Sequence, residues 1–317
     1  MKICRGLCRD IPGRTTAVTI GTYDGVHIGH RAILKKLRKI ANENNELATV
    51  VTFNPHPQLV VNNKKKNEIK LLNTEEEKIS LLESLGIDIL VILQFDRDMA
   101  MMSAQEFVTS IIFNKLNAKH VVIGYDHNFG KNREGGLKTI TALADEFGGH
   151  VEFMGPVSRE EIVISSTKIR HLLLDGKIQT ANKLLGRNYQ ISGIVTTGDG
   201  RGKKLGFPTA NIQPLSPLKL IPQNGIYAVR VLIDGQAYQG ISYIGCRPTF
   251  YSGNIGHQIE VNIYDFSTDL YSKNIILEFI SKIRDDKKFD SPEDLAKQIL
   301  KDKEKSIVIF ENFERSN

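Results

Sequence analysis

Residues 21–30, Gly-Thr-Tyr-Asp-Gly-Val-His-Ile-Gly-His, constrain the fold more than any other stretch of this 317-residue chain. A short apolar run at residues 15–20 precedes them and is typical of a β-strand, and residues 31–41 carry apolar side chains at helical spacing. Glycine lets the backbone turn sharply and approach a ligand closely. The sequence therefore predicts a strand–loop–helix corner here.

This corner has the chemistry of an anion site. A helix that starts here directs backbone N–H groups and the positive end of its dipole at the corner, which favours a phosphate. His27 and His30 add side-chain donors. A glycine-rich turn after a strand is common and a single histidine in it is often incidental, but the pair favours a functional site.

The same ten residues resemble the His-x-Gly-His signature of the nucleotidyltransferase superfamily. In their full form they are similar to the FAD synthetase half of the bacterial bifunctional riboflavin kinase/FAD synthetases. That resemblance implies a Rossmann-like α/β domain in which FMN and ATP react to give FAD and pyrophosphate. It also implies catalytic roles for His27 and His30.

The rest of the first half alternates strands with helices, which favours a parallel sheet covered on both faces. Strands are expected at residues 47–53, 87–93, 119–124 and 150–153, and Thr74-x-x-Glu77 is a capping box that starts a helix. Ligands bind at the carboxyl ends of strands in such sheets. Asn54 and His56, and later residues 125–130, follow strands at that edge.

Residues 164–170, Ile-Ser-Ser-Thr-Lys-Ile-Arg, predict a helix with Ser165 or Ser166 as its N-cap. A capped helix without a ligand is one interpretation. The other is a second phosphate-binding site, since hydroxyls, the start of a helix, Lys168 and Arg170 lie together. The segment resembles the Ile-Ser-Ser-Thr-x-Ile-Arg motif of the same family.

The resemblance implies roles for a larger set of residues in this half. Those expected to bind the nucleotide are Gly21, Tyr23, Asp24, Gly29, His30, Ser165, Ser166, Thr167 and Arg170. Those expected near the flavin are Asn54, His56 and Asp126. His127 stands where the family has an aromatic residue, so stacking on the flavin is left open at that position.

The second half has the pattern of a small antiparallel barrel or sandwich. Strands are expected at residues 189–197, 225–233, 236–244, 259–264 and 274–280, with a hairpin turn at Asp234-Gly235. Ser291 and Pro292 begin a final helix as N-cap and N1. We therefore expect two domains, an adenylyltransferase at residues 1–186 and a kinase at residues 187–317.

Residues 198–211 are rich in glycine and basic side chains, which suits a phosphate-binding loop and also an ordinary glycine-rich hairpin. Their Gly-Phe-Pro-Thr-Ala-Asn ending resembles the riboflavin kinase signature. Thr209 and Asn211 are oxygen donors two residues apart, so on an extended segment both can face one Mg²⁺. The resemblance implies ATP contacts at Gly198, Gly200, Gly202, Lys204, Gly206, Pro208 and Thr209.

Phosphorylation of an alcohol also needs a carboxylate to accept the proton. Glu260 lies on the polar face of an alternating strand, where an ordinary surface carboxylate would also lie. The family pattern, continued by Asp265-Phe266, implies that Glu260 is the catalytic base. It also implies that Arg284 and Phe289 lie near the flavin, and Tyr243 stands where the family has Asn.

Composition limits the partners and the compartment. The net charge of +6 suits polyphosphate substrates and nucleic acid alike, but the chain has no Trp and no basic stripe interleaved with aromatics, so no nucleic-acid partner is expected. No apolar run is long enough for a bilayer, and the first residues are too polar for a signal peptide. Three cysteines, an odd count, fit a reducing compartment, so we expect a cytoplasmic protein. We also expect a monomer or weak homo-oligomer without a membrane partner.

Taken together, these patterns predict an enzyme that uses ATP and Mg²⁺ to convert riboflavin to FMN in its second half and FMN to FAD in its first. Two alternatives stay open. One is a flavin-binding regulator that kept the folds and lost turnover. The other is an enzyme in which only one half is active, or whose first half has another nucleotidyltransferase specificity.

Overall fold

The computed structural model describes most of the chain, namely residues 1–7, 13–61, 69–125, 129–131, 134–198, 206–248 and 255–315. The side chains of residues 247–248 and 255–257 are outside this description. The chain divides into two compact units, Met1–Ser166 and Thr167–Asn317.

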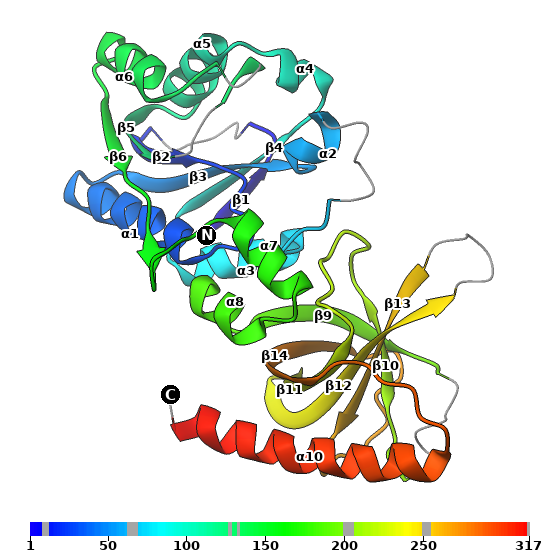
Figure 1. The fold of residues 1–317 in the computed structure, drawn as a ribbon. Helices are drawn as coiled ribbons and strands as arrows, with labels where there is room; N and C mark the ends of the chain where they lie inside the picture. Colours follow the sequence, from blue (N-terminus) through cyan, green and yellow to red (C-terminus); the bar gives the residue numbers. More distant parts are fainter. Residues whose placement is uncertain are drawn as a thin grey trace. The chain divides into compact units, whose positions relative to one another are not determined.

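The first unit is built on a six-stranded parallel sheet (Figure 1). Its strands are β1 (Lys2–Arg5), β2 (Thr16–Ile20), β3 (Leu47–Asn54), β4 (Ile89–Gln94), β5 (Ala118–Gly124) and β6 (His150–Met154). The order is β1-β4-β3-β2-β5-β6, so β3 and β4 follow on one side of β2, and β5 and β6 follow on its other side. The crevice beside β2 at the carboxyl edge is where such sheets bind ligands.

Helices cover both faces of this sheet, as the alternating pattern predicts (Figure 1). Successive strand residues point to opposite faces, so Val50 and Leu90 pack with α1 (Ile28–Glu43) and α3 (Glu75–Ser84), whereas Val51 and Val91 pack on the other side. That other side holds α5 (Ala104–Glu106), the π-helical segment η2 (Phe107–Lys115) and α6 (Leu137–Glu146). The shorter elements of this unit are α2 (Pro57–Val61), α4 (Arg97–Met101), β7 (Ser158–Arg159) and β8 (Ile162–Val163).

The second unit contains a closed six-stranded antiparallel barrel. Of the two predicted architectures, the barrel is therefore confirmed and the sandwich is not. Its strands are β9 (Tyr189–Thr196), β10 (Ala210–Pro214), β11 (Gly225–Ile233), β12 (Gln236–Pro248), β13 (Ile255–Ile263) and β14 (Asn274–Arg284). The β11–β12 hairpin turns at Asp234 and Gly235, whose φ angles of 50° and 83° confirm the predicted turn. The helices α7 (Ser166–Leu174) and α8 (Ile178–Leu185) precede the barrel in the chain.

The last helix, α10 (Pro292–Arg315), packs against the outside of the barrel (Figure 1). Phe310 joins Ala228, Ile241 and Ile280 of the barrel wall in one apolar cluster. The Ser291 hydroxyl accepts a hydrogen bond from the Asp294 N–H at 3.1 Å, which confirms the predicted N-cap.

Strands β1 and β10 were not expected, because each has a single buried residue and no apolar run, whereas the similarly short β2 is mostly apolar and is buried throughout. Among the described cysteines, Cys4 is disulfide-bonded and Cys246 is free and exposed, so the odd cysteine count is poor support for a reducing compartment.

Across the described part of the chain, no helix is long and apolar enough to cross a membrane.

A buried ion pair fixes α10 to the end of β14. Arg284 Nε lies 3.0 and 2.9 Å from the two Asp302 carboxylate oxygens, and the Asp302 side chain is only 1% exposed. We expect Asp302→Asn to lower the free energy of unfolding of the barrel by about 3–5 kcal/mol, because the Arg284 charge would lose its buried partner. Urea denaturation of the full chain measures this. Glu304→Gln, at an exposed acid on the same helix, is the control, and equal effects of the two changes would contradict the prediction.

Candidate active sites

The two histidines of the first unit lie together at the start of α1. His27 is the N-cap, and its Nδ1 accepts a hydrogen bond from the His30 N–H at 3.3 Å. The two imidazole rings stack with centroids 3.6 Å apart. Gly29 permits this arrangement, since a Cβ there would come within 3.2 Å of the His27 ring. The predicted strand–loop–helix corner is therefore present, and both imidazoles lie at the N-terminus of α1.

The charge distribution around this corner suits an anion. Residues 28–31, the first turn of α1, are all described and include no acidic side chain, so no carboxylate of that turn opposes an anion at the positive end of the helix dipole. His27 is only 5% exposed, whereas His30 is half-buried. His30 is therefore the more accessible of the two to a ligand.

Two residues expected to touch the nucleotide also make contacts that hold the loop in place. The Asp24 carboxylate is buried and accepts hydrogen bonds from the N–H groups of Leu72 at 2.9 Å and Asn73 at 3.2 Å. The Tyr23 hydroxyl lies 2.6 Å from Thr19 Oγ1, and burial raises the pKa of Tyr23. These contacts favour a positioning role for both residues, and their contact with a nucleotide stays a prediction.

Lys78, in the first turns of α3, is a further support that the sequence analysis missed. Its ammonium donates to the Thr22 carbonyl at 2.8 Å and lies 3.4 Å from Thr52 Oγ1. Burial lowers the pKa of Lys78, and the carboxylates of Asp24 and Glu75 act in the opposite direction. The available signal was the Thr74 capping box, present as predicted, which fixes where α3 starts.

The Ile-Ser-Ser-Thr motif reaches the same corner. Helix α7 begins at Ser166, and the Ser166 hydroxyl donates to the Asp24 carbonyl at 2.8 Å. Thr167 and Arg170 belong to the second unit, so their contact with a nucleotide stays a prediction.

Of the residues expected near the flavin, Asn54 and His56 lie close together. Both line a small cavity of about 40 Å³, together with Asp24, Glu75 and Lys78. The Asn54 side-chain amide donates to the Glu75 carboxylate. Since this cavity has room for ordered water but not for a flavin, the two residues can form only one wall of a flavin site. Asp126 and His127 lie outside the described residues.

The barrel brings together the residues expected to bind metal and to accept a proton. Asn211 of β10 is paired with Glu260 of β13, and Thr209 Oγ1 donates to Glu260 Oε2 at 2.9 Å. The Gln258 amide donates to the other carboxylate oxygen. The Asn262 amide donates to the Pro208 carbonyl at 2.7 Å, which ties the segment just before β10 to β13. A hydroxyl, an amide and a carboxylate oxygen are the hard donors that Mg²⁺ prefers.

Part of the predicted phosphate loop lies outside the described residues, including Gly200, Gly202 and Lys204. Its two ends are described. A Cβ on Gly198 would lie 1.9 Å from Asn211 Nδ2, so only glycine allows the Asn211 side chain its observed place. Gly206 has φ +84°, a conformation that favours glycine.

Arg284 and Phe289, both expected near the flavin, are in contact with each other. The Arg284 guanidinium lies 5.6 Å from the Phe289 ring centroid and also donates to the Asp285 carbonyl at 3.0 Å. The other N–H groups of the Arg284 guanidinium contact the Asp302 carboxylate, so Arg284 holds α10 against the barrel. Its contact with a flavin stays a prediction.

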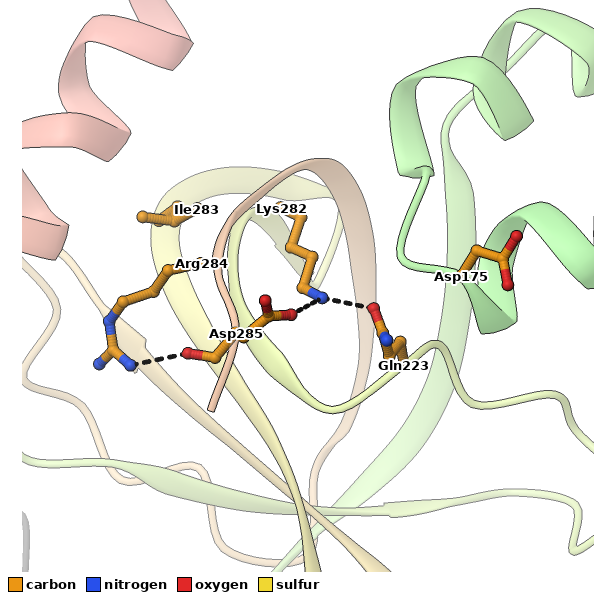
Figure 2. A pocket seen from close by; sticks show the side chains of 6 residues that line it. All are labelled: Asp175, Gln223, Lys282, Ile283, Arg284 and Asp285. Atoms are coloured by element: carbon orange, nitrogen blue, oxygen red, sulfur yellow. Dashed lines mark hydrogen bonds and ion pairs between the residues drawn. The ribbon is translucent and has the colours of Figure 1, made fainter. Parts of the chain in front are cut away.

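Figure 2 shows the shallow pocket of about 390 Å³ next to Arg284. The Lys282 ammonium lies between Gln223 Oε1 and Asp285 Oδ1, at 2.5 Å from each, while Arg284 points away from this cluster. The hydrogen bond from Lys282 lowers the pKa of Asp285. Because Lys282 is already paired with a carboxylate, this pocket has little attraction for a phosphate.

Comparison with known proteins assigns a class to each half of the chain. Residues 12–168 match the family model of FAD synthetase, and residues 185–310 match that of riboflavin kinase. The chain is thus a nucleotidyltransferase region followed by a flavin kinase region.

The full-length relatives combine both halves. The chain is 36% identical over 301 residues to the bifunctional riboflavin kinase/FMN adenylyltransferase of Bacillus subtilis, covering 95% of this chain and 94% of that protein. It is 38% identical over 307 residues to the protein of the same name from Buchnera aphidicola, covering 95% and 96%. The chain belongs to the family of bifunctional riboflavin kinases/FMN adenylyltransferases.

A solved structure extends the likeness to the whole fold. It is titled as a macrolide-efflux protein from Streptococcus pneumoniae, is 31% identical, and superposes with a TM-score of 0.87 over 96% of this chain and 98% of that chain. The two proteins therefore share the architecture described above from end to end.

The close approach of Gly198 and Asn211 yields a prediction. We expect Gly198→Ala to lower riboflavin phosphorylation about 10²-fold, since an added methyl group would displace the Asn211 amide by an ångström or more. Steady-state assays of FMN formation measure the effect. Gly155→Ala is the matched control, because a Cβ there has no neighbour within 4 Å. Normal FMN formation by Gly198→Ala would show that the place of Asn211 is unimportant.

Proposed function

We propose that residues 187–317 phosphorylate riboflavin to FMN and that residues 1–186 adenylylate FMN to FAD. The observation that carries the proposal is the hydrogen bond between Thr209 and Glu260 beside Asn211, which gathers a carboxylate and neutral oxygens at one place on the barrel. The order of the two matched family regions supports it. A domain boundary at residues 186/187, next to the start of the second match, remains part of the proposal.

In the kinase reaction, the Glu260 carboxylate accepts the proton of the riboflavin 5′-hydroxyl as that oxygen attacks the γ-phosphorus of ATP. The bond from the γ-phosphorus to the β,γ-bridging oxygen breaks, and ADP leaves. Thr209 and Gln258 orient the two carboxylate oxygens of Glu260. The Thr209 hydroxyl donates a hydrogen bond to Glu260, so the lone pairs of Thr209 Oγ1 remain available to bind a cation.

The oxygen donors present fit Mg²⁺, and Thr209 and Asn211 would hold it with the ATP phosphates. The chemistry that this ion supplies when bound is neutralisation of phosphate charge. Gly200, Gly202 and Lys204 of the same loop, which lie outside the described residues, are proposed to bind the phosphates with Gly198, Gly206 and Pro208.

In the adenylyltransferase reaction, a phosphate oxygen of FMN attacks the α-phosphorus of ATP and pyrophosphate leaves. The attacking group comes from the substrate, so the protein has to align two anions and stabilise developing charge. His30 and the start of α1 suit that task, and His27 fixes the His30 backbone. Ser165, Ser166, Thr167 and Arg170 are proposed to hold the nucleotide, and Asn54, His56 and Asp126 to lie near the flavin.

Two substitutions test whether the sites are separate. We expect His30→Ala to lower FAD formation from supplied FMN by about 10²–10³-fold, through loss of charge stabilisation, without changing FMN formation. We expect Glu260→Gln to lower FMN formation by about 10²–10⁴-fold, through loss of the base, without changing FAD formation from FMN.

Chromatographic separation of flavins after incubation with ATP measures both products in one sample. Circular dichroism of each variant serves as the folding control. If either change abolished both activities in a folded protein, the two-site proposal would fail. If the unmodified chain made neither product, the enzymatic proposal itself would fail.

A further inference from the structure

Strand pairing places five residues side by side across the barrel wall. Asn211 is paired with Glu260, Glu260 with Tyr243, Tyr243 with Ile226, and Ile226 with Arg284. Paired residues on neighbouring strands point to the same face of a sheet, and neighbouring strands are about 4.8 Å apart. Tyr243 is therefore next to Glu260 and about 10 Å from Arg284, counted as two strand spacings.

This row lies on the outer face of the barrel. The residues that follow or precede its members in the strands, such as Tyr227, Ile244 and Val261, are fully or almost fully buried and fill the interior. Ile226, a member of the row, packs with the apolar cluster beneath α10. The row thus runs along the surface from the proposed base to the residues proposed to lie near the flavin.

The Tyr243 side chain is held in a defined orientation within this row. A Cβ on Gly245 would lie 2.0 Å from the Tyr243 hydroxyl, so the ring extends along β12 over that glycine. The hydroxyl donates to Asp286 Oδ2 at 3.2 Å. Burial, followed by the carboxylates of Asp286 and Glu260, raises the pKa of Tyr243 to about 12. The phenol is therefore protonated at neutral pH and keeps an oxygen lone pair for a second partner.

We propose that Tyr243 binds the ribityl chain of riboflavin and thereby positions the 5′-hydroxyl at Glu260. This inference rests on the proposed kinase function. When the 5′-hydroxyl lies at Glu260 and the ring system lies toward Phe289, the secondary hydroxyls of the chain pass over Tyr243. Of the two row members between Glu260 and Arg284, Tyr243 is the one with a hydrogen-bonding side chain, since the other is the apolar Ile226.

The test compares Tyr243→Phe with Tyr238→Phe in the full-length chain. Tyr238 lies on the same strand, and its hydroxyl has its own partner, Gln236 Oε1 at 2.7 Å, so the control also loses one hydrogen bond. We expect Tyr243→Phe to raise the riboflavin Kd, measured by flavin fluorescence quenching, and the riboflavin KM by about 2–12-fold, the equivalent of one hydrogen bond. We expect no change in the KM for ATP, and no change of any constant in Tyr238→Phe.

Lumiflavin, which has the same isoalloxazine ring system with a methyl group in place of the ribityl chain, identifies the contacted part of the substrate. Its inhibition constant should be the same for Tyr243→Phe and the unmodified chain. An equal rise for lumiflavin and riboflavin would overturn the inference, because Tyr243 would then act on the ring or through the Asp286 segment. An unchanged riboflavin Kd in Tyr243→Phe would also overturn it. Absence of FMN formation by the unmodified chain would instead defeat the proposed function, so the two failures are distinguishable.

Discussion

Backbone pairing between strands that are distant in the sequence determines where the chemistry of this protein lies. The antiparallel pairing of β10 with β13 sets Asn211 opposite Glu260, although 48 residues separate them in the printed sequence. In the first unit, the parallel pairing of β2 with β3 and β5 places the corner after β2 in the middle of the sheet. Each site is thus positioned by a rigid scaffold, and its side chains need only short-range contacts to be aligned.

Buried polar groups give these sites their shape, and each is compensated by a partner. The Asp24 carboxylate receives two backbone N–H groups, and the Lys78 ammonium donates to the Thr22 carbonyl. An unpaired polar group at these positions would cost several kcal/mol, so the paired arrangement strongly favours one conformation of the corner. The Arg284–Asp302 pair has the same effect on α10, since it limits how that helix can slide along the barrel.

Local signals in the sequence predicted the parts of this structure that depend on neighbouring residues. The Thr74 capping box, the Asp234-Gly235 turn and the Ser291 cap all involve residues within a few positions of one another, and all are present. The resemblance supplied Glu260, which the residue pattern alone could not separate from a surface carboxylate. Lys78 and Asp302 were missed because their partners come from other elements, so no periodicity within α3 or α10 reveals them.

The alternation of the barrel wall has a consequence for how such a chain can diverge. Glu260 faces outward, whereas its neighbours Ile259 and Val261 fill the interior. One residue inserted into β13 ahead of Glu260 would exchange these two faces, burying a carboxylate and exposing isoleucine. A single insertion at this point of β13 would therefore disrupt the proposed kinase site, whereas an insertion in a connection between strands leaves both faces of the wall in place.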